Sequence, residues 1–483
     1  MQGPGGHQVR AKARKPKGPD LDLATAGARE LVEAMTAREL SSRELLAELL
    51  DRVEQYNPSL NAVVTLDVER AMAAAARADA AIADGHVLGP LHGLPMTVKD
   101  TFATAAMRTT AGATELADHV PDRDAMAVAR LRQAGAVVFG KTNSPAFAGD
   151  WQTVNDVFGP TNNPWDLGRT PGGSSGGSAA ALSAGLTPLE VGSDIGGSIR
   201  NPAHFCGVVG HKPTRGVIPY RGHVPSPLGQ PDLAVAGPMA RRVTDVRLAL
   251  SVLVGPDDEN SVAWKLKLPK ARTDDVAGLR LAALVDEPST PVDEAVRASL
   301  RGALDALEAA GATVDRQPPL PLDLFEVNLL YQRMVGPEVI ADHQLTHTEW
   351  LAASERRQQL RAEIAHFFTR YDALLLPAFS VPAFPHDHRP MDERRLVVDG
   401  REEPYSQTAM FWAGLATLLW LPATVVPVGL VAGGPAGLPV GVQIVGPYLG
   451  DRTTLGVAAA VERLMGPVGV PPLLRTDAEQ VDL

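Results

Sequence analysis

Two short clusters of glycine and serine, at residues 172–178 and 192–200, carry the residue types best suited to chemistry in this chain. The first cluster reads Gly-Gly-Ser-Ser-Gly-Gly-Ser, and the second reads Gly-Ser-Asp-Ile-Gly-Gly-Ser-Ile-Arg. A serine hydroxyl can act as a nucleophile or pass a proton when a base lies close to it. Because glycine loses more backbone entropy on folding than any other residue, two such clusters indicate unusual backbone torsions or a close approach to a ligand.

The second cluster is expected to form a turn between a strand and a helix. Residues 189–191 are Leu-Glu-Val, which is typical of a strand, and residues 199–203 follow the turn as Ile-Arg-Asn-Pro-Ala. A turn of this kind can direct several backbone N–H groups at one oxygen atom, as a tetrahedral acyl intermediate requires. Ser198, at the end of the turn, is therefore the candidate nucleophile.

The first cluster is expected to lead into a helix, because an Ala-rich run at residues 178–182 follows it directly. Ser174 would then lie on the preceding loop. Residues 172–176 also fit the Gly-x-Ser-x-Gly nucleophile elbow of α/β-hydrolases, which would make Ser174 the nucleophile of an esterase. An elbow serine directly follows a hydrophobic strand, however, whereas residues 166–171 have the composition of a loop. We therefore rank this alternative lower.

Two simpler interpretations of the clusters are a flexible loop and a turn that cradles phosphate. Neither cluster continues into the Gly-Lys-Ser/Thr of a phosphate-binding loop, and neither has the Gly-x-Gly-x-x-Gly spacing of a dinucleotide site. The patterns therefore disfavour phosphate binding, and the flexible loop is the alternative that remains.

A candidate base precedes both clusters in the chain. Residues 96–98, Met-Thr-Val, follow a turn rich in proline and glycine and predict a short buried strand that ends at Lys99. Functional groups in open α/β sheets gather at the carboxyl ends of strands. A lysine can accept a proton near neutral pH only if burial lowers its pKa from about 10.4, and the end of a buried strand favours such burial.

Taken together, these segments resemble the amidase signature family, which consists of serine hydrolases of amides. The resemblance rests on the two clusters, on residues 202–207 after the second one, and on residues 90–100. The spacing between the lysine and the two serines also agrees with the family. Further matching segments extend the resemblance over residues 21 to about 465.

The resemblance implies a role for each of the three residues. Ser198 would be the nucleophile, Ser174 a bridging serine that follows a cis peptide bond, and Lys99 the base. Neutral Lys99 would take a proton from Ser174 while Ser174 takes one from the attacking Ser198, and the relay would later protonate the leaving amine. The implied oxyanion hole consists of four backbone N–H groups, those of Ile195, Gly196, Gly197 and Ser198.

Three further residues in the clusters are interpreted as supporting ones. Asp194 and Arg200 flank the nucleophile and are expected to form a charge pair that holds the turn. Ser175 adjoins the bridging serine. A substrate pocket lined by Trp151, Met410, Phe411 and Trp412 is also expected, and its aromatic character favours an apolar or aryl substrate.

The rest of the chain predicts the elements that position these residues. Strand-like and helix-like segments alternate, which favours an α/β fold with one large, mixed, twisted sheet covered by helices on both faces. The resemblance implies the same fold. We expect a disordered basic tail at residues 1–20 and a single domain at 21–483, with core motifs at 90–260 and a helix-rich insertion or lid at about 320–405.

Composition excludes several classes of function. The net charge of -11 argues against a nucleic-acid partner or an anionic membrane surface. No apolar run is long enough to span a membrane, and the single cysteine fits a reducing compartment. Without further cysteines or a His-Glu-x-x-His pattern, no metal is expected, and neither is a cofactor. We expect a cytoplasmic monomer or homodimer that acts on a small-molecule amide.

The sequence is compatible with several classes of amide substrate. Members of the family hydrolyse aliphatic amides, aryl acylamides and carbamates. The leading hypothesis is a metal-independent amidohydrolase that works through a covalent acyl-enzyme. An alternative is the glutaminase subunit of a tRNA-dependent amidotransferase, which functions only within a complex.

Overall fold

The computed structural model describes residues 21–22, 25–224, 229, 231–273, 275–339 and 344–475. The tail predicted at residues 1–20 lies outside this part of the chain, so its disorder remains a prediction. Among the described residues, no helix is both long enough and apolar enough to cross a membrane.

The centre of the molecule is a mixed sheet of eight strands in the order β4-β6-β5-β12-β13-β9-β7-β8. Strand β7 runs parallel to β8 and β9, while the other neighbouring pairs are antiparallel. This arrangement confirms the expected mixed α/β sheet. The strands are β4 (Leu189–Asp194), β5 (Val209–Lys212), β6 (Val235–Ala240), β7 (Arg280–Ala283), β8 (Thr313–Asp315), β9 (Ala373–Pro377), β12 (Ala423–Val431) and β13 (Leu438–Val445).

A second sheet of three strands, separate from the expected large sheet, carries the lysine. It consists of β1 (Val63–Leu66), β2 (Pro95–Lys99) and β3 (Val137–Thr142), with β2 and β3 parallel. Strand β2 contacts β4 of the large sheet. Side chains make this junction: the Thr97 N–H donates to Thr187 Oγ1 over 3.1 Å, and the Thr97 hydroxyl donates to Glu190. Because side-chain acceptors replace the backbone ladder here, the two sheets stay separate.

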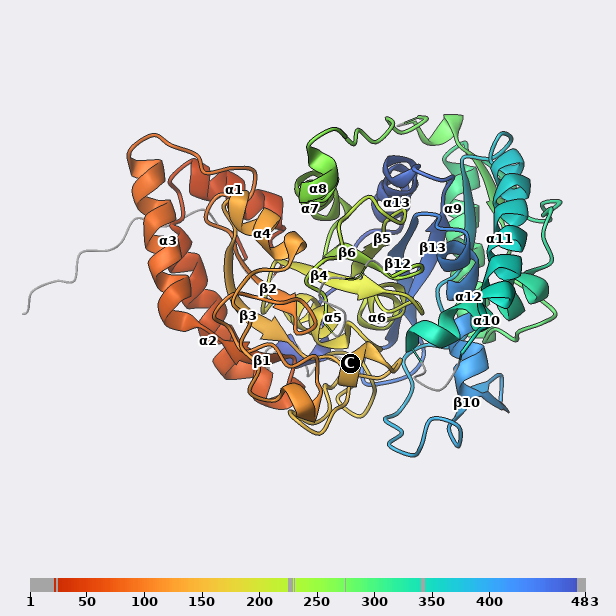
Figure 1. The fold of residues 1–483 in the computed structure, drawn as a ribbon, viewed down its shortest axis with the longest axis horizontal. Helices are drawn as coiled ribbons and strands as arrows, with labels where there is room; N and C mark the ends of the chain where they lie inside the picture. The colour runs from red at the N-terminus through yellow and green to blue at the C-terminus, as the bar shows by residue number, and fades with distance from the viewer. Residues whose placement is uncertain are drawn as a thin grey trace, which may run out of the picture.

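Helices surround the sheets and form groups at the two ends of the molecule (Figure 1). The capping box predicted at Ser41 and Glu44 is confirmed, since each side chain accepts the other residue's backbone N–H. The helices are α1 (Ala28–Thr36), α2 (Ser42–Leu60), α3 (Val68–Ala83), α4 (Met126–Gln133), α5 (Gly176–Ser183), α6 (Arg200–Cys206), α7 (Val243–Leu253), α8 (Asp258–Ser261), α9 (Glu294–Ala309), α10 (Leu324–Val339), α11 (His347–Phe367), α12 (Tyr405–Leu418) and α13 (Asp451–Met465).

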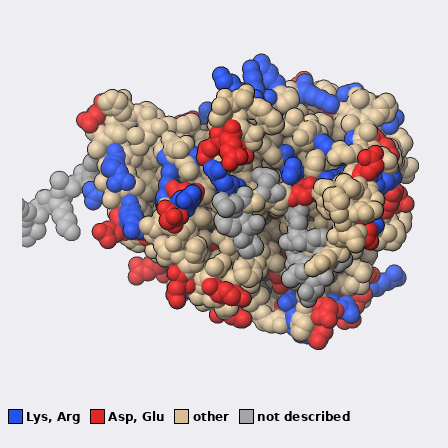
Figure 2. Space-filling view, viewed as in Figure 1, with Lys and Arg blue, Asp and Glu red and all other residues tan. Residues whose placement is uncertain are grey.

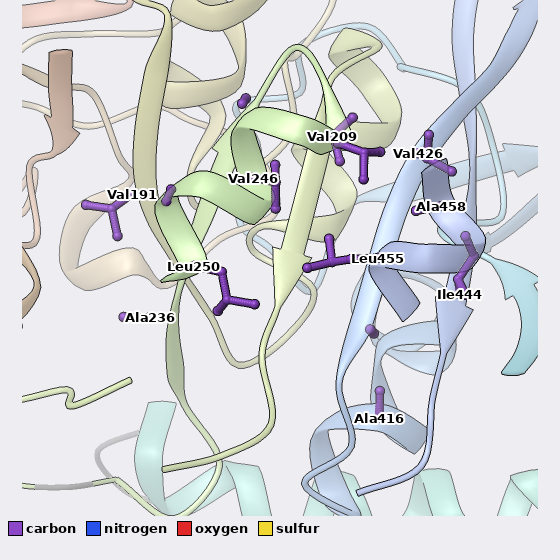
Figure 3. Close-up of a cluster of buried hydrophobic side chains, with 14 of the residues drawn as sticks. Val191, Val209, Ala236, Val246, Leu250, Ala416, Val426, Ile444, Leu455 and Ala458 are labelled. Atoms are coloured by element: carbon purple, nitrogen blue, oxygen red, sulfur yellow. The ribbon is translucent and has the colours of Figure 1, made fainter. Parts of the chain in front are cut away.

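Both faces of the large sheet are covered by helices, as expected. On one face Met239 of β6 packs with Ala179 of α5 and Ala203 of α6. On the other face Ala236 of β6 belongs to the main core, which includes Leu250 of α7. Successive strand residues point to opposite faces, so the alternation along β6 buries apolar side chains in both layers. Figure 3 shows part of this core, where α7 and α13 contribute Val246, Leu250, Leu455 and Ala458.

The segment predicted as an insertion or lid, residues 320–405, contains one strand of the large sheet. Strand β9 pairs with β13 and β7, so it belongs to the sheet. Helices α10 and α11 lie at one end of the molecule (Figure 1). The segment ends in a hairpin of β10 (Arg395–Val398) and β11 (Arg401–Pro404). Movement of this segment remains a prediction.

Charged side chains of both signs are interspersed over the face of the molecule drawn in Figure 2. The view shows no continuous basic area on this face. Binding to phosphate groups requires clustered lysine and arginine side chains. That nucleic acid is not a partner remains a prediction from the sequence.

Candidate active site

The structure brings Lys99 and the two glycine-serine clusters together. Lys99 ends strand β2 and is completely buried, and its Nζ lies 2.6 Å from Ser174 Oγ. Ser198 lies on the turn between β4 and α6. The N–H of Ser175 donates to the carbonyl of Ser198 over 3.1 Å, which joins the two clusters directly.

The backbone around Ser174 is a loop followed by helix α5. The peptide bond between Gly173 and Ser174 is cis, as the resemblance implies. Residues 170–173 have no strand conformation, so the strand-to-serine junction of an α/β-hydrolase elbow is absent at this position.

Lys99 has the electrostatic environment that a neutral amine requires. Burial lowers the pKa of Lys99 to about 7, although the carboxylates of Asp194 and Glu190 act in the opposite direction. Near neutral pH a large fraction of this side chain is therefore unprotonated and able to accept a proton.

A second serine and a histidine complete the surroundings of Lys99, and sequence reasoning assigned neither of them. The Lys99 Nζ lies 3.0 Å from Ser193 Oγ, and Ser193 Oγ lies 2.9 Å from His223 Nε2. Burial, together with the nearby Lys99, holds the pKa of His223 well below its ordinary value, so its imidazole is neutral. Ser193 could have been found because it belongs to the second cluster, whereas no local pattern connects His223 with Lys99.

The charge pair predicted between Asp194 and Arg200 is confirmed. Both residues are buried, and Arg200 Nη2 lies 2.7 Å from Asp194 Oδ1. Burial alone would raise the pKa of Asp194, but the Arg200 guanidinium outweighs it and holds that pKa below its ordinary value. The Asp194 carboxylate also accepts the N–H groups of Gly197 and Ile199, each over 3.1 Å. The pair therefore fixes both sides of the turn that carries Ser198.

The four N–H groups of the expected oxyanion hole differ in their partners. The Gly197 N–H already donates to Asp194. The N–H groups of Ile195, Gly196 and Ser198 have no acceptor among the residues that the structure describes. The carbonyl of Ile195 accepts the Tyr331 hydroxyl over 2.7 Å, and Tyr331 is a contact that the sequence did not reveal.

The expected pocket residues occupy two different environments. Trp151 lies beside the turn, and its Nε1 donates to the carbonyl of Gly196 over 2.8 Å. Met410 is partly buried against the main core. Phe411 and Trp412 are only 6% and 3% exposed, and they line a cavity of about 10 Å³ between α10 and α12, which is too small for a substrate. These two side chains are therefore part of the core.

Comparison with known proteins places the chain in a family. The family model described as Amidase matches residues 44–338 and 326–455. A subunit of the glutamyl-tRNA(Gln) amidotransferase of Moorella thermoacetica is 34% identical over 481 residues, which cover 92% of this chain and 97% of that protein.

Solved structures of the same fold cover almost the whole chain. A bacterial aryl acylamidase of the amidase signature family superposes with a TM-score of 0.80 at 26% identity, covering 91% of this chain and 96% of that one. A chain of a vestigial protein complex, whose structure reveals the evolutionary origins of an s-triazine catabolic enzyme, superposes with a TM-score of 0.79 at 29% identity, covering 92% of this chain and 99% of that one. From the matched family, the shared fold and these relatives it follows that the chain belongs to the amidase signature family of amide-hydrolysing enzymes.

Proposed function

We propose that this protein hydrolyses the amide bond of a small apolar or aryl substrate, such as an aryl acylamide or a carbamate, through an acyl-enzyme on Ser198. In this proposal Ser174 relays protons and Lys99 is the base. The observation that carries it is the buried Lys99 amine, which has a pKa of about 7 and lies 2.6 Å from Ser174 Oγ.

The proposed reaction begins with neutral Lys99. Its amine accepts the proton of Ser174, Ser174 accepts the proton of Ser198, and Ser198 Oγ forms a bond to the carbonyl carbon. Negative charge then develops on the carbonyl oxygen, and backbone N–H groups of the turn stabilise it.

Collapse of the tetrahedral intermediate breaks the C–N bond. The relay runs in reverse and delivers a proton to the nitrogen, because an amide anion is a very poor leaving group. A water molecule then attacks the acyl-enzyme by the same relay, which releases the carboxylic acid and returns the proton to Ser198. Cleavage of the C–N bond of a carbamate would release the amine in the first step and a carbonate monoester in the second.

Aromatic side chains beside the turn support an apolar or aryl substrate. Trp151 and Tyr331 both donate to carbonyls of the turn that carries Ser198. Trp151 also packs edge-to-face against Tyr405, with ring centroids 5.6 Å apart. Of these rings, Trp151 is partly exposed, and it offers apolar area for a substrate with little loss of side-chain entropy. A structural neighbour with a TM-score of 0.80 is an aryl acylamidase, which agrees with this inference.

Covalent labelling tests the proposal. The protein is incubated with an activated aryl amide to measure hydrolysis, and with a serine-directed fluorophosphonate whose adduct is located by peptide mass spectrometry. We expect amine release and a single adduct on Ser198, with no adduct in Ser198→Ala. An adduct on Ser174 with Ser198 unmodified would overturn the relay and favour the elbow alternative.

A second candidate is the glutaminase subunit of a tRNA-dependent amidotransferase, because a relative with 34% identity is a subunit of such an enzyme. Glutamine would require a carboxylate free to bind its ammonium group. Asp150, next to Trp151, and Asp194, at the end of β4, are instead paired with Arg394 and Arg200. Ammonia release from glutamine that depends on added partner subunits would favour this candidate over a stand-alone amidase.

A further inference from the structure

We propose that Tyr331 is a positioning residue that sets the orientation of the Gly196 N–H, and that this N–H is an oxyanion donor whereas the Gly197 N–H is not. The inference rests on the proposed function of the turn that carries Ser198. It assigns a role to helix α10, which lies more than a hundred residues further along the chain.

Tyr331 can set the direction of the Gly196 N–H because it holds the peptide unit between Ile195 and Gly196. The Tyr331 hydroxyl donates to the Ile195 carbonyl over 2.7 Å. In a trans peptide unit the C=O and N–H groups point in opposite directions. Holding the Ile195 carbonyl toward Tyr331 therefore turns the Gly196 N–H to the other side, where it has no acceptor among the described residues.

The next peptide unit, between Gly196 and Gly197, has hydrogen-bond partners at both its C=O and its N–H, and it can be compared with the first. The Gly196 carbonyl accepts Trp151 Nε1 over 2.8 Å and Asn201 Nδ2 over 3.4 Å. The Gly197 N–H donates to Asp194 over 3.1 Å. This unit is therefore fixed in place, but its N–H is occupied and cannot serve a substrate oxygen without leaving Asp194.

Packing around Tyr331 restricts the position of its ring. Tyr331 is completely buried. Gly414 of α12 lies against the ring, and a Cβ added there would lie 2.9 Å from Tyr331 Cδ1. A glycine at this position of α12 therefore allows α10 to bring the Tyr331 hydroxyl to the turn. Gly414→Ala is predicted to displace the ring without removing the hydroxyl.

The loss of the Tyr331 hydroxyl should affect the transition state selectively. Without that donor the peptide unit can rotate and turn the Ile195 carbonyl toward the site. The partly negative carbonyl oxygen would then take the place of the Gly196 N–H. Removing a whole oxyanion donor lowers kcat by about 10²- to 10³-fold in a serine hydrolase. Because Tyr331→Phe only loosens a donor, we expect kcat to fall about 10- to 100-fold, with KM changed less than about 3-fold.

Transition-state analogues provide the deciding readout. The full-length enzyme is assayed with an activated aryl amide and with an aryl trifluoromethyl ketone, which forms a tetrahedral adduct with a nucleophilic serine. In Tyr331→Phe we expect the ketone affinity to fall by the same factor as kcat/KM, while a non-reacting aryl product analogue binds as in the wild type. Gly414→Ala should show a smaller loss with the same pattern.

Tyr405→Phe is the matched control. Tyr405 is also buried, and its hydroxyl donates to Asp150 over 2.8 Å, so the same atom and a bond of similar length are removed. We expect the thermal midpoint of Tyr405→Phe to fall about as much as that of Tyr331→Phe. The ratio of ketone affinity to product affinity in Tyr405→Phe should change less than about 3-fold from the wild type.

Two results would overturn the inference. One is a Tyr331→Phe enzyme whose ketone affinity is unchanged, and the other is an enzyme whose ketone and product affinities fall equally. Either result, obtained while the wild type still forms its adduct on Ser198, would remove the role of Tyr331 and leave the proposed function intact. Absence of the Ser198 adduct in the wild type would instead contradict the proposed function.

Discussion

Lys99 lies on strand β2 and Lys141 on the parallel strand β3, where Lys99 pairs with Thr142 and Lys141 with Val98, and both lysines are completely buried. Burial lowers the pKa of Lys99 to about 7 and that of Lys141 to about 8. Their partners differ. Lys99 contacts the hydroxyls of Ser174 and Ser193. Lys141 donates to the Phe102 carbonyl and to the hydroxyls of Thr104 and Thr109, and it lies 3.9 Å from the Asp100 carboxylate.

The comparison shows that a lowered pKa does not identify a catalytic base. Lys212 is a third buried lysine, with a pKa of about 7, and it donates to the carbonyls of Leu421 and Pro213. A backbone carbonyl accepts a hydrogen bond but has no proton to give. Only the partners of Lys99 include a serine that lies on the loop joined to the Ser198 turn. The partner, more than the burial, distinguishes the proposed base.

Replacement of Lys99 should have the largest effect on activity. Lys99→Ala removes the proposed base, so we expect kcat for an aryl amide to fall at least about 10³-fold. Lys99→Arg should not restore it, because a guanidinium stays protonated at every accessible pH. Initial rates and circular dichroism of the two variants check this expectation, and wild-type rates in either variant would remove Lys99 from the mechanism.

Replacement of Lys141 should mainly affect stability. Lys141→Met leaves the Asp100 carboxylate buried without its nearest cation, and breaking a buried ion pair on one side destabilises a protein by about 3 kcal/mol. We expect a lower thermal midpoint and a loss of kcat below about 10-fold. The measurements are a thermal unfolding scan and kcat for the same aryl amide. A stable Lys141→Met enzyme without activity would reverse the roles assigned to the two lysines.

The pH dependence of stability should reveal the ionisation of Lys99. The folded state holds the pKa of Lys99 at about 7, whereas the unfolded chain has about 10.4. Between these values the unfolded state binds more protons, so this residue makes stability rise with pH. The difference in unfolding free energy between Lys99→Met and the wild type should therefore favour the variant more at pH 6 than at pH 10. A difference that does not change with pH would contradict the lowered pKa.

Local patterns predicted the parts of the site that are local in the chain. The strand ending at Lys99, the turn before Ser198 and the pair of Asp194 with Arg200 follow from short stretches of sequence. The contacts of His223 and Tyr331 do not, because packing of distant elements creates them.

Two features of the structure did not follow from the sequence, and both have physical causes. The large mixed sheet is as expected, but a separate three-stranded sheet lies next to it, where Thr97 of β2 is hydrogen-bonded to the side chains of Thr187 and Glu190. Phe411 and Trp412 were expected in the substrate pocket because aromatic side chains suit an aryl ligand. They fill the space between α10 and α12 instead, since the same apolar area also stabilises a core.

The rate at which Ser198 is acylated, measured as a function of pH, tests the central claim most directly. Stopped-flow assays with an activated aryl ester or amide would follow the first turnover between pH 5 and 9. Because Lys99 must be neutral to act as the base, we predict a rate that falls about tenfold per pH unit below about 7 and is constant above that value. An acylation rate that is independent of pH over this range would contradict the assignment of Lys99 as the base.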